Sequence, residues 1–229
     1  MEKLGALVSS GKDSLYAMQL MKERGFEIAC LITVFSLNKD SFMFHTPATE
    51  LVKLQAESLG LPLVTQETEG KKEEELADLK KAIKKAKGKY GVTGVVTGAL
   101  HSEYQSERIK RICRELKMNV YSPLWHMNQE KELNELLDRG YEFVFTRIAA
   151  EGLDKTWLGR AITKKDVKKL AELSKKFGLN VAGEGGEFES LVLNMPLFSK
   201  KIKLVKTGII SETENSATLV VKSAKLAAD

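Results

Sequence analysis

Cysteine and long apolar runs are scarce in this sequence of 229 residues, and each absence excludes a class of protein. The two cysteines, Cys30 and Cys113, lie far apart, so the sequence offers no disulfide framework and no C-x-x-C metal pair. No apolar run approaches the ~20 residues that a membrane helix needs, and no signal-peptide pattern is visible. No internal repeat or low-complexity linker is present either. We therefore expect a cytoplasmic protein with no membrane partner.

Charge of one sign is not in large excess. The net charge is +5, from 36 Lys and Arg against 31 Asp and Glu. The lysines of residues 71–89 and 163–178 alternate with acidic and apolar residues at helical spacing, which is typical of solvated helix faces. The charge thus argues against a nucleic acid partner. The hydrophobic fraction of 43% suits one large domain or two small ones with a real core.

Residues 4–25 have the pattern of a strand, a tight loop and a helix. Residues 4–8 form a short apolar run, which is typical of a buried parallel strand, and Gly25 stands where a helix end favours positive φ. The loop SSGKDS, residues 9–14, combines hydroxyls, a glycine and a lysine at the start of the helix, where unpaired N–H groups attract anions. We expect this loop to bind a polyphosphate.

Two known phosphate loops can be compared with this segment. The ATPase P-loop does not fit, because five residues separate Gly5 from Gly11 and an Asp follows Lys12 where a metal-binding hydroxyl should stand. The segment instead resembles the PP-loop, SGGxDS, of the ATP pyrophosphatases, which split ATP into AMP and pyrophosphate. Read alone, it also fits an ordinary turn and helix cap. The resemblance implies these phosphate-binding residues: Ser9, Ser10, Gly11, Lys12, Asp13 and Ser14.

The PP-loop resemblance also implies roles within the loop. Lys12 and Asp13 are the expected catalytic residues, and Asp13 is the expected ligand of a Mg²⁺ ion. Ser10 replaces the first glycine of the PP-loop pattern.

Strands and helices alternate up to residue 122. This alternation implies an α/β fold with a parallel five-stranded sheet, and we expect the HUP-like strand order 3-2-1-4-5. The pattern changes afterwards to a smaller α+β domain, so we expect domains at residues 1–122 and 123–229. The expected strands are residues 4–8, 27–35, 61–66, 92–97, 120–121 and 141–154, with two antiparallel strands in residues 201–225. The expected helices include residues 48–60, 73–89, 102–117 and 164–177.

The carboxyl ends of these strands should line the nucleotide, because ligands of open α/β sheets bind there. Thr33, near the end of the second strand, is a candidate for the adenine, and Gly98 and Ala99 should let ribose or phosphates approach the backbone. His45 lies in an aromatic-rich loop that could act as a lid, although packing explains a lone histidine equally well. The following helix adds three substrate-binding candidates: Tyr104, Gln105 and Arg108.

A glycine-rich acidic segment, GEGGEFE, occupies residues 183–189. Glu184, Glu187 and Glu189 surround the pair Gly185 and Gly186. If a strand begins near Glu187, then Glu187 and Glu189 point to the same side. Two like charges side by side repel unless a cation lies between them. Spacing alone fits a solvated glycine hairpin as well.

Seven segments together resemble the diphthine–ammonia ligase family, over nearly the whole chain. They are SSGKDS, MFHTP, TGALHSEYQSER, SPLWHMNQ, AAEGLD, LGR and GEGGEFESLVLN. The resemblance implies ATP-dependent amidation of diphthine on translation elongation factor 2 by free ammonium, through an acyl-adenylate. AMP and pyrophosphate would be released.

Ammonium must lose a proton before it attacks. With the Lys amine pKa of ~10.4 as a proxy, this costs on the order of 4 kcal/mol at neutral pH, so a nearby carboxylate should accept the proton. Glu187 and Glu189 are the expected catalytic residues, with Glu184, Gly185 and Gly186 beside the substrate. The trimethylammonium group of diphthine favours aromatic faces. The candidates for it are Tyr104, Trp125 and Phe188.

Other functions stay open. A PP-loop enzyme that modifies tRNA is one, although thiolation usually requires paired cysteines or a metal cluster. A glutamine-dependent amidotransferase is disfavoured, because no N-terminal cysteine or glutaminase domain is present. A non-catalytic adenine-nucleotide sensor would bind ATP, yet it gives no reason for GEGGEFE. The oligomeric state stays open, and a homodimer is one alternative.

Overall fold

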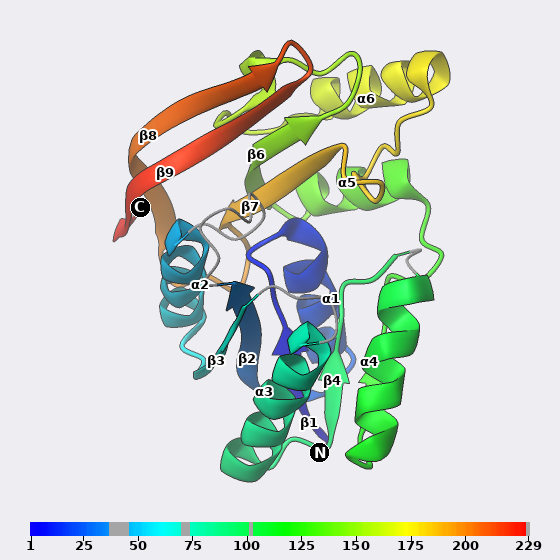
Figure 1. Cartoon of the computed structure of the whole chain (residues 1–229), viewed down its shortest axis with the longest axis vertical. Helices are drawn as coiled ribbons and strands as arrows, with labels where there is room; N and C mark the ends of the chain where they lie inside the picture. Colours follow the sequence, from blue (N-terminus) through cyan, green and yellow to red (C-terminus); the bar gives the residue numbers. More distant parts are fainter. Residues whose placement is uncertain (37–45, 70–73, 101–102, 228–229) are drawn as a thin grey trace. The chain divides into compact units, whose positions relative to one another are not determined.

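The computed structural model describes residues 1–36, 46–69, 74–100 and 103–227 (Figure 1). The chain divides into two compact units, Met1–Trp125 and His126–Asp229. Each unit is built on its own sheet. No helix in the described ranges is both long and apolar enough to cross a membrane.

The first unit is a five-stranded parallel sheet of order β3-β2-β1-β4-β5, which confirms the predicted fold and strand order. The chain runs outward from β1 to β3 and then returns to β4, so its direction reverses beside β1. The loop after β1 therefore lies at the switch point where such sheets bind ligands. The strands are β1 Lys3–Leu7, β2 Glu27–Ser36, β3 Leu63–Thr68, β4 Gly94–Val96 and β5 Asn119–Tyr121. The helices are α1 Lys12–Glu23, α2 Thr46–Leu59, α3 Glu74–Tyr90 and α4 Glu103–Glu115.

Both cysteines belong to the apolar core of the first unit. Cys30 on β2 and Cys113 on α4 are fully buried, in one cluster with Ile83 of α3 and Val95 of β4. Burial raises the pKa of Cys30 to about 12 and that of Cys113 to about 11. Thiols with such pKa values are hardly ionised at neutral pH, so both act as packing residues.

The second unit is a four-stranded antiparallel sheet of order β7-β6-β9-β8. The predicted strand over residues 141–154 is too long, because β6 ends at Ala149. Gly152 then takes φ 87°, and Asp154 caps a short 3-10 helix by accepting a hydrogen bond from the Thr156 backbone N–H at 2.8 Å. The strands are β6 Glu142–Ala149, β7 Phe188–Asn194, β8 Lys201–Thr213 and β9 Ser216–Ala227. The helices are α5 Gln129–Asp138, η1 Lys155–Trp157 and α6 Lys164–Phe177.

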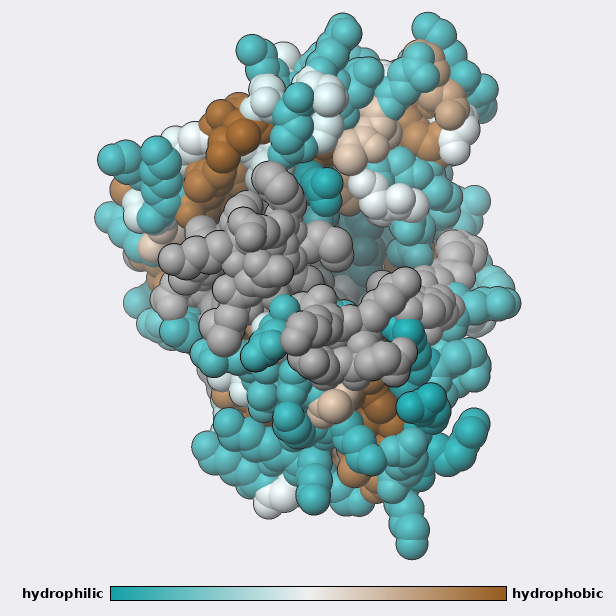
Figure 2. All heavy atoms as spheres, in the orientation of Figure 1, coloured by the Kyte–Doolittle hydropathy of each residue, from teal (hydrophilic) through white to brown (hydrophobic). Residues whose placement is uncertain are grey.

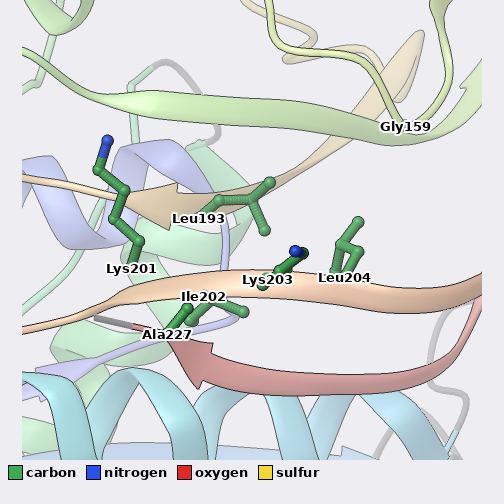
Figure 3. A pocket seen from close by; sticks show the side chains of 7 residues that line it. All are labelled: Gly159, Leu193, Lys201, Ile202, Lys203, Leu204 and Ala227. Carbon is green, nitrogen blue, oxygen red and sulfur yellow. The ribbon is translucent and has the colours of Figure 1, made fainter. Parts of the chain in front are cut away.

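The β8–β9 ribbon separates from the rest of this sheet along most of its length. β6 pairs with β9 only over residues 147–149, and its earlier residues bond instead to segment 158–162, as in Gly159 N–H to Phe145 O at 3.0 Å. A pocket of about 590 Å³ lies where the strands diverge (Figure 3). It contains none of the residues predicted for chemistry. Its lining includes Leu193, Ile202, Leu204 and Ala227, with Lys201 and Lys203 beside them.

Helix α6 has the bounds that the sequence predicts, because signals at both ends define it. Thr163 and Asp166 form a reciprocal capping box at its start, and Gly178 ends it with φ 76°. Arg160 donates two hydrogen bonds to the Asp166 carboxylate, at 2.9 and 2.8 Å. Burial alone would raise the pKa of Asp166, but the bonds from Arg160 and Thr163 outweigh it and lower the pKa to about 2.

Asp166 therefore makes stability depend on pH in acid. Its stabilising effect should be complete above the ordinary value of 3.8 and should disappear as the pH falls towards about 2. Asp166→Asn should lower the free energy of unfolding near neutral pH by about 1–3 kcal/mol and remove this part of the acid sensitivity. Urea unfolding across that pH range measures both effects. The exposed Glu172→Gln on the same helix is the control, and equal effects of the two substitutions would contradict the assignment.

Candidate functional site

The phosphate loop joins β1 directly to α1. Ser10 lies in the left-handed region with φ 71°, and Gly11 precedes the helix with φ −78° and ψ 165°. Gly11 has no side chain that could cap the start of α1. The Ser14 hydroxyl donates to Gly11 O at 3.2 Å, which keeps it at the loop. The loop thus leads directly into the first turn of a helix, where N–H groups and the helix dipole favour an anion.

A buried cation lies beside an accessible carboxylate in this loop. The Lys12 side chain is 1% exposed, and its Nζ is 2.5 Å from Asp13 Oδ1. The Asp13 side chain is 29% exposed. A lysine held by packing supplies a fixed positive charge for phosphates, while Asp13 remains open on one side.

Gly98 is required for backbone packing. A Cβ at this position would lie 2.5 Å from Asp13 C and 2.5 Å from Ser14 N, far inside contact distance. The segment after β4 can thus approach the first turn of α1 only because residue 98 has no side chain. Room for α1 is thus a reason for Gly98 that the sequence did not show, and room for ribose or phosphate stays a prediction. The neighbouring Ala99 and, on β2, Thr33 are both buried.

Gln55 supports the loop from α2, and sequence reasoning missed it. Its Nε2 donates to Ser10 O at 3.0 Å, and the residue is fully buried. The bond joins residues 45 positions apart, so no local pattern marks it. Gln55 and Ser58 are polar residues on the buried side of α2, and such residues usually have hydrogen-bond partners.

Ser10→Gly should stabilise the protein, because a left-handed φ costs a non-glycine residue about 1 kcal/mol or more. Glycine adopts φ 71° without that cost and is the residue that the PP-loop pattern has here. We expect the free energy of unfolding to rise by about 0.5–1 kcal/mol, after the loss of chain entropy by glycine is subtracted. Chemical denaturation measures it. A clear loss of stability would show that the Ser10 side chain is needed in its buried position.

The glycine-rich loop of the second unit is organised by Glu187. Glu187 Oε1 accepts hydrogen bonds from the Asn180 backbone N–H at 2.7 Å and from Asn180 Nδ2 at 2.8 Å, and Oε2 accepts from Gly185 N–H at 2.8 Å. Gln129 completes the network: it donates to Asn180 Oδ1 at 3.2 Å and accepts from Ala182 N–H at 3.0 Å. Gln129 is the last residue of the motif SPLWHMNQ, so these hydrogen bonds explain the glutamine at the end of that motif.

Glu189 has a different environment. It lies on β7 opposite Arg147 of β6, with Arg147 Nη1 3.8 Å from Glu189 Oε1. Burial raises the pKa of Glu189, and the lowering by Arg147 offsets this only in part. The side chain is nevertheless 40% exposed, so solvent or a ligand can reach it. An accessible carboxyl with a raised pKa suits a general base.

Glu187 and Glu189 have different partners. Strand β7 begins at Phe188, and the Glu187 carboxylate binds the loop before it, whereas Glu189 lies beside Arg147. Phe188 is unsuitable for binding trimethylammonium, because it is 4% exposed and stacks on Phe145 with ring centroids 3.9 Å apart. Of this segment, Glu184, Gly185 and Gly186 remain at the surface or near it.

The remaining predicted substrate residues belong to the first unit. Trp125 is half-buried, and Lys110 Nζ lies 5.9 Å from its ring centroid, so the ring already accepts a cation. Arg108 is half-buried on α4. Tyr104 and Gln105 belong to the first turns of α4, but their side chains are not described. His45 lies outside the described residues.

No preformed metal centre accompanies these loops. Over the described part of the chain, no three His, Cys, Asp or Glu residues gather in a way that could hold a metal ion. Asp13 is the one predicted ligand. Mg²⁺ is often bound by a single carboxylate together with substrate phosphates and water, so this arrangement fits the ion.

Comparison with known proteins relates the segments that contain these two loops to one protein family. The description "Diphthamide synthase N-terminal domain" matches residues 2–120, and "Diphthamide synthase C-terminal domain" matches residues 128–226. The chain belongs to the diphthamide synthase family. Each matched domain falls within one of the two units, with the phosphate loop in the first and GEGGEFE in the second.

Curated relatives of this chain carry the name diphthine–ammonia ligase. The protein of Bos taurus is 33% identical, over 93% of this chain and 87% of its own length. Those of Rattus norvegicus and Homo sapiens are 36% and 35% identical, over 87% and 91% of this chain and 82% and 85% of their own lengths. A solved structure, titled as a predicted subunit of tRNA methyltransferase from Methanocaldococcus jannaschii, aligns with TM-score 0.43 at 17% identity, a likeness too weak to inform function.

Proposed function

We propose that this chain amidates the carboxylate of diphthine on translation elongation factor 2, with ATP and ammonium as co-substrates. The observation that carries the proposal is the similarity to named diphthine–ammonia ligases over about nine-tenths of the chain, joined to the loop SSGKDS at the sheet's switch point. The diphthine carboxylate would attack the α-phosphorus of ATP, and pyrophosphate would leave. Ammonia would then attack the acyl carbon, and AMP would leave.

The first unit, Met1–Trp125, would bind the nucleotide. The N–H groups of the first turn of α1, the Ser9 and Ser14 hydroxyls and the buried Lys12 ammonium would hold the phosphates. Asp13 would hold Mg²⁺ with the phosphates, and that ion would neutralise charge on the leaving pyrophosphate. Thr33 and Ala99 are the proposed contacts of the nucleoside, and Trp125 is the remaining aromatic candidate for the trimethylammonium group.

The second unit, His126–Asp229, would supply the base. Glu189, with its raised pKa and open side chain, would bind ammonium and accept its proton. Glu187 would act as a positioning residue, because its carboxylate is committed to the loop that precedes β7. Glu184 would remain a polar contact for the substrate.

Isotopically labelled ammonium tests the function directly. The protein is incubated with ATP, Mg²⁺, labelled ammonium and diphthine-bearing elongation factor 2, and the modified peptide is analysed by mass spectrometry. We expect the label in an amide on the diphthine side chain, and no label without ATP. ATP binding with no labelled amide would favour the nucleotide sensor. Label recovered on RNA in a parallel incubation that contains tRNA would favour an RNA-modifying enzyme.

A further inference from the structure

Strand β8 is an exposed and partly apolar edge of the second unit's sheet. It pairs with β9 on one side and is last in the strand order (Figure 1). Among the described residues, four large hydrophobic side chains are well exposed, and three of them lie on β8: Val205 at 56%, Ile209 at 46% and Ile210 at 52%. Apolar side chains gather over the β8–β9 ribbon in the space-filling view (Figure 2). Such an edge is a template for pairing with another strand.

The free edge has a short regular stretch with a defined centre. Register shifts interrupt the β8–β9 ladder on both sides of Lys206 and again between Ser211 and Thr213. Residues 207–211 are therefore the longest stretch that pairs without interruption, next to a shorter one at residues 201–204. Ile209 is the middle of that stretch. Lys206 and Glu212 flank it symmetrically, three residues before and three residues after Ile209.

We propose that β8 of a second copy of this chain pairs antiparallel with this edge, with Ile209 opposite Ile209 on the two-fold axis. In this register Lys206 faces Glu212 of the second copy, and the same ion pair forms again on the other side of the axis. Thr207 faces Ser211, and Ile210 faces Gly208, whose missing side chain leaves room for the isoleucine. In this register the facing side chains match in charge, polarity and size.

The side chains involved are accessible for this pairing. Lys206 and Glu212 are exposed. The Glu212 carboxylate accepts from Thr218 Oγ1 at 3.1 Å on the β9 side, and a carboxylate has about four acceptor sites, so it can also accept from a second copy.

A second copy fits better than an unrelated strand, because the sequence around Ile209 is complementary to its own reverse. A two-fold axis also closes the assembly, since each β8 edge is used once and no further edge is created. The register shifts limit the regular pairing to residues 207–211, and the two Lys206–Glu212 ion pairs lie at the ends of that segment. The contact is thus smaller than the ~1,600 Å² of a standard interface, and we expect a concentration-dependent equilibrium between monomer and dimer.

Cysteine cross-linking tests the register. Residue 209 is the one position that faces itself, so Ile209→Cys should form a disulfide-linked dimer under mild oxidation. Directly opposed residues of antiparallel strands have Cα atoms about 4.5–5.5 Å apart, which a disulfide can span. Ser211→Cys is the matched control and should stay unlinked, since residue 211 faces residue 207. The native Cys30 and Cys113 are buried and should not interfere. Equal cross-linking of the two variants, or none at position 209, would overturn the proposal.

Charge exchange tests the ion pairs by analytical ultracentrifugation. Lys206→Glu places two glutamates opposite each other and should raise the dimer dissociation constant by about tenfold or more. Adding Glu212→Lys to it restores opposite charges and should return the constant towards its original value. Lys165→Glu on α6 is the control for net charge and should have no effect. A protein that is monomeric at all concentrations, or a dimer indifferent to these changes, would refute the interface. Neither outcome bears on the proposed ligase activity.

Discussion

Gly98→Ala is expected to abolish measurable ATP binding at concentrations that saturate the unmodified protein. The added Cβ would lie 2.5 Å from two backbone atoms of the first turn of α1, and backbone cannot rotate away as a flexible side chain can. The helix start must therefore shift, and the N–H groups of residues 11–14 lose their alignment with the phosphates. We expect a loss of stability of about 1–3 kcal/mol and an increase of the ATP dissociation constant of more than about a hundredfold.

Gly88→Ala is the matched control for this substitution. Gly88 lies within α3, and a Cβ there would meet no atom within 4 Å. Alanine is the better helix former, so this variant should gain about 0.5–1 kcal/mol of stability and bind ATP normally. Calorimetric titration with ATP and thermal unfolding measure both quantities. If Gly98→Ala bound ATP as tightly as Gly88→Ala, the packing of residue 98 on α1 would have no part in the nucleotide site.

Glu189→Gln is expected to lower the rate of amide formation by about a hundredfold or more, with little change in ATP affinity. A general base contributes typically 10²–10⁴-fold, and the glutamine amide is neutral and cannot accept the ammonium proton. Because free ammonia becomes abundant as the pH rises towards the pKa of ammonium, alkaline pH should partly restore the activity of this variant. The unmodified enzyme should lose activity in acid, as Glu189 is protonated through its raised pKa.

Glu187→Gln should behave differently, because it damages the loop. The Nε2 group of the glutamine donates and cannot accept, so either Gly185 N–H or Asn180 loses its acceptor, at a cost of about 0.5–1.5 kcal/mol. We expect faster proteolysis near residue 185 and a loss of activity that alkaline pH does not restore. The decisive readout is the pH profile of amide formation for both variants. If alkaline pH restored the activity of Glu187→Gln, or did not restore that of Glu189→Gln, the roles assigned to these two residues would be contradicted.

The parallel sheet could be predicted because its signals are local. Apolar runs mark the strands, and Gly25, with φ 89°, marks the end of α1 from a few neighbouring residues. The end of β6 could not be predicted in the same way. The apolar pattern continues after Ala149, and the strand ends there because Gly152 takes a positive φ and the chain turns.

The candidate site was predictable as a set of segments and less so as a set of contacts. The phosphate loop and GEGGEFE are visible in the sequence, but the residues that hold them are distant. Gln55 reaches Ser10 across 45 positions, and Gln129 reaches Ala182 across 53. Likewise, tertiary packing buries Phe188 and leaves its neighbour Glu189 partly exposed, and the local sequence does not show this difference.

Nucleotide product analysis tests the central claim most directly. The protein is supplied with ATP labelled in the α-phosphate, Mg²⁺ and ammonium, with or without diphthine-bearing elongation factor 2. The account predicts labelled AMP and an equal amount of pyrophosphate, formed only when the elongation factor is present. Labelled ADP with orthophosphate, or AMP formed at the same rate without the elongation factor, would contradict it.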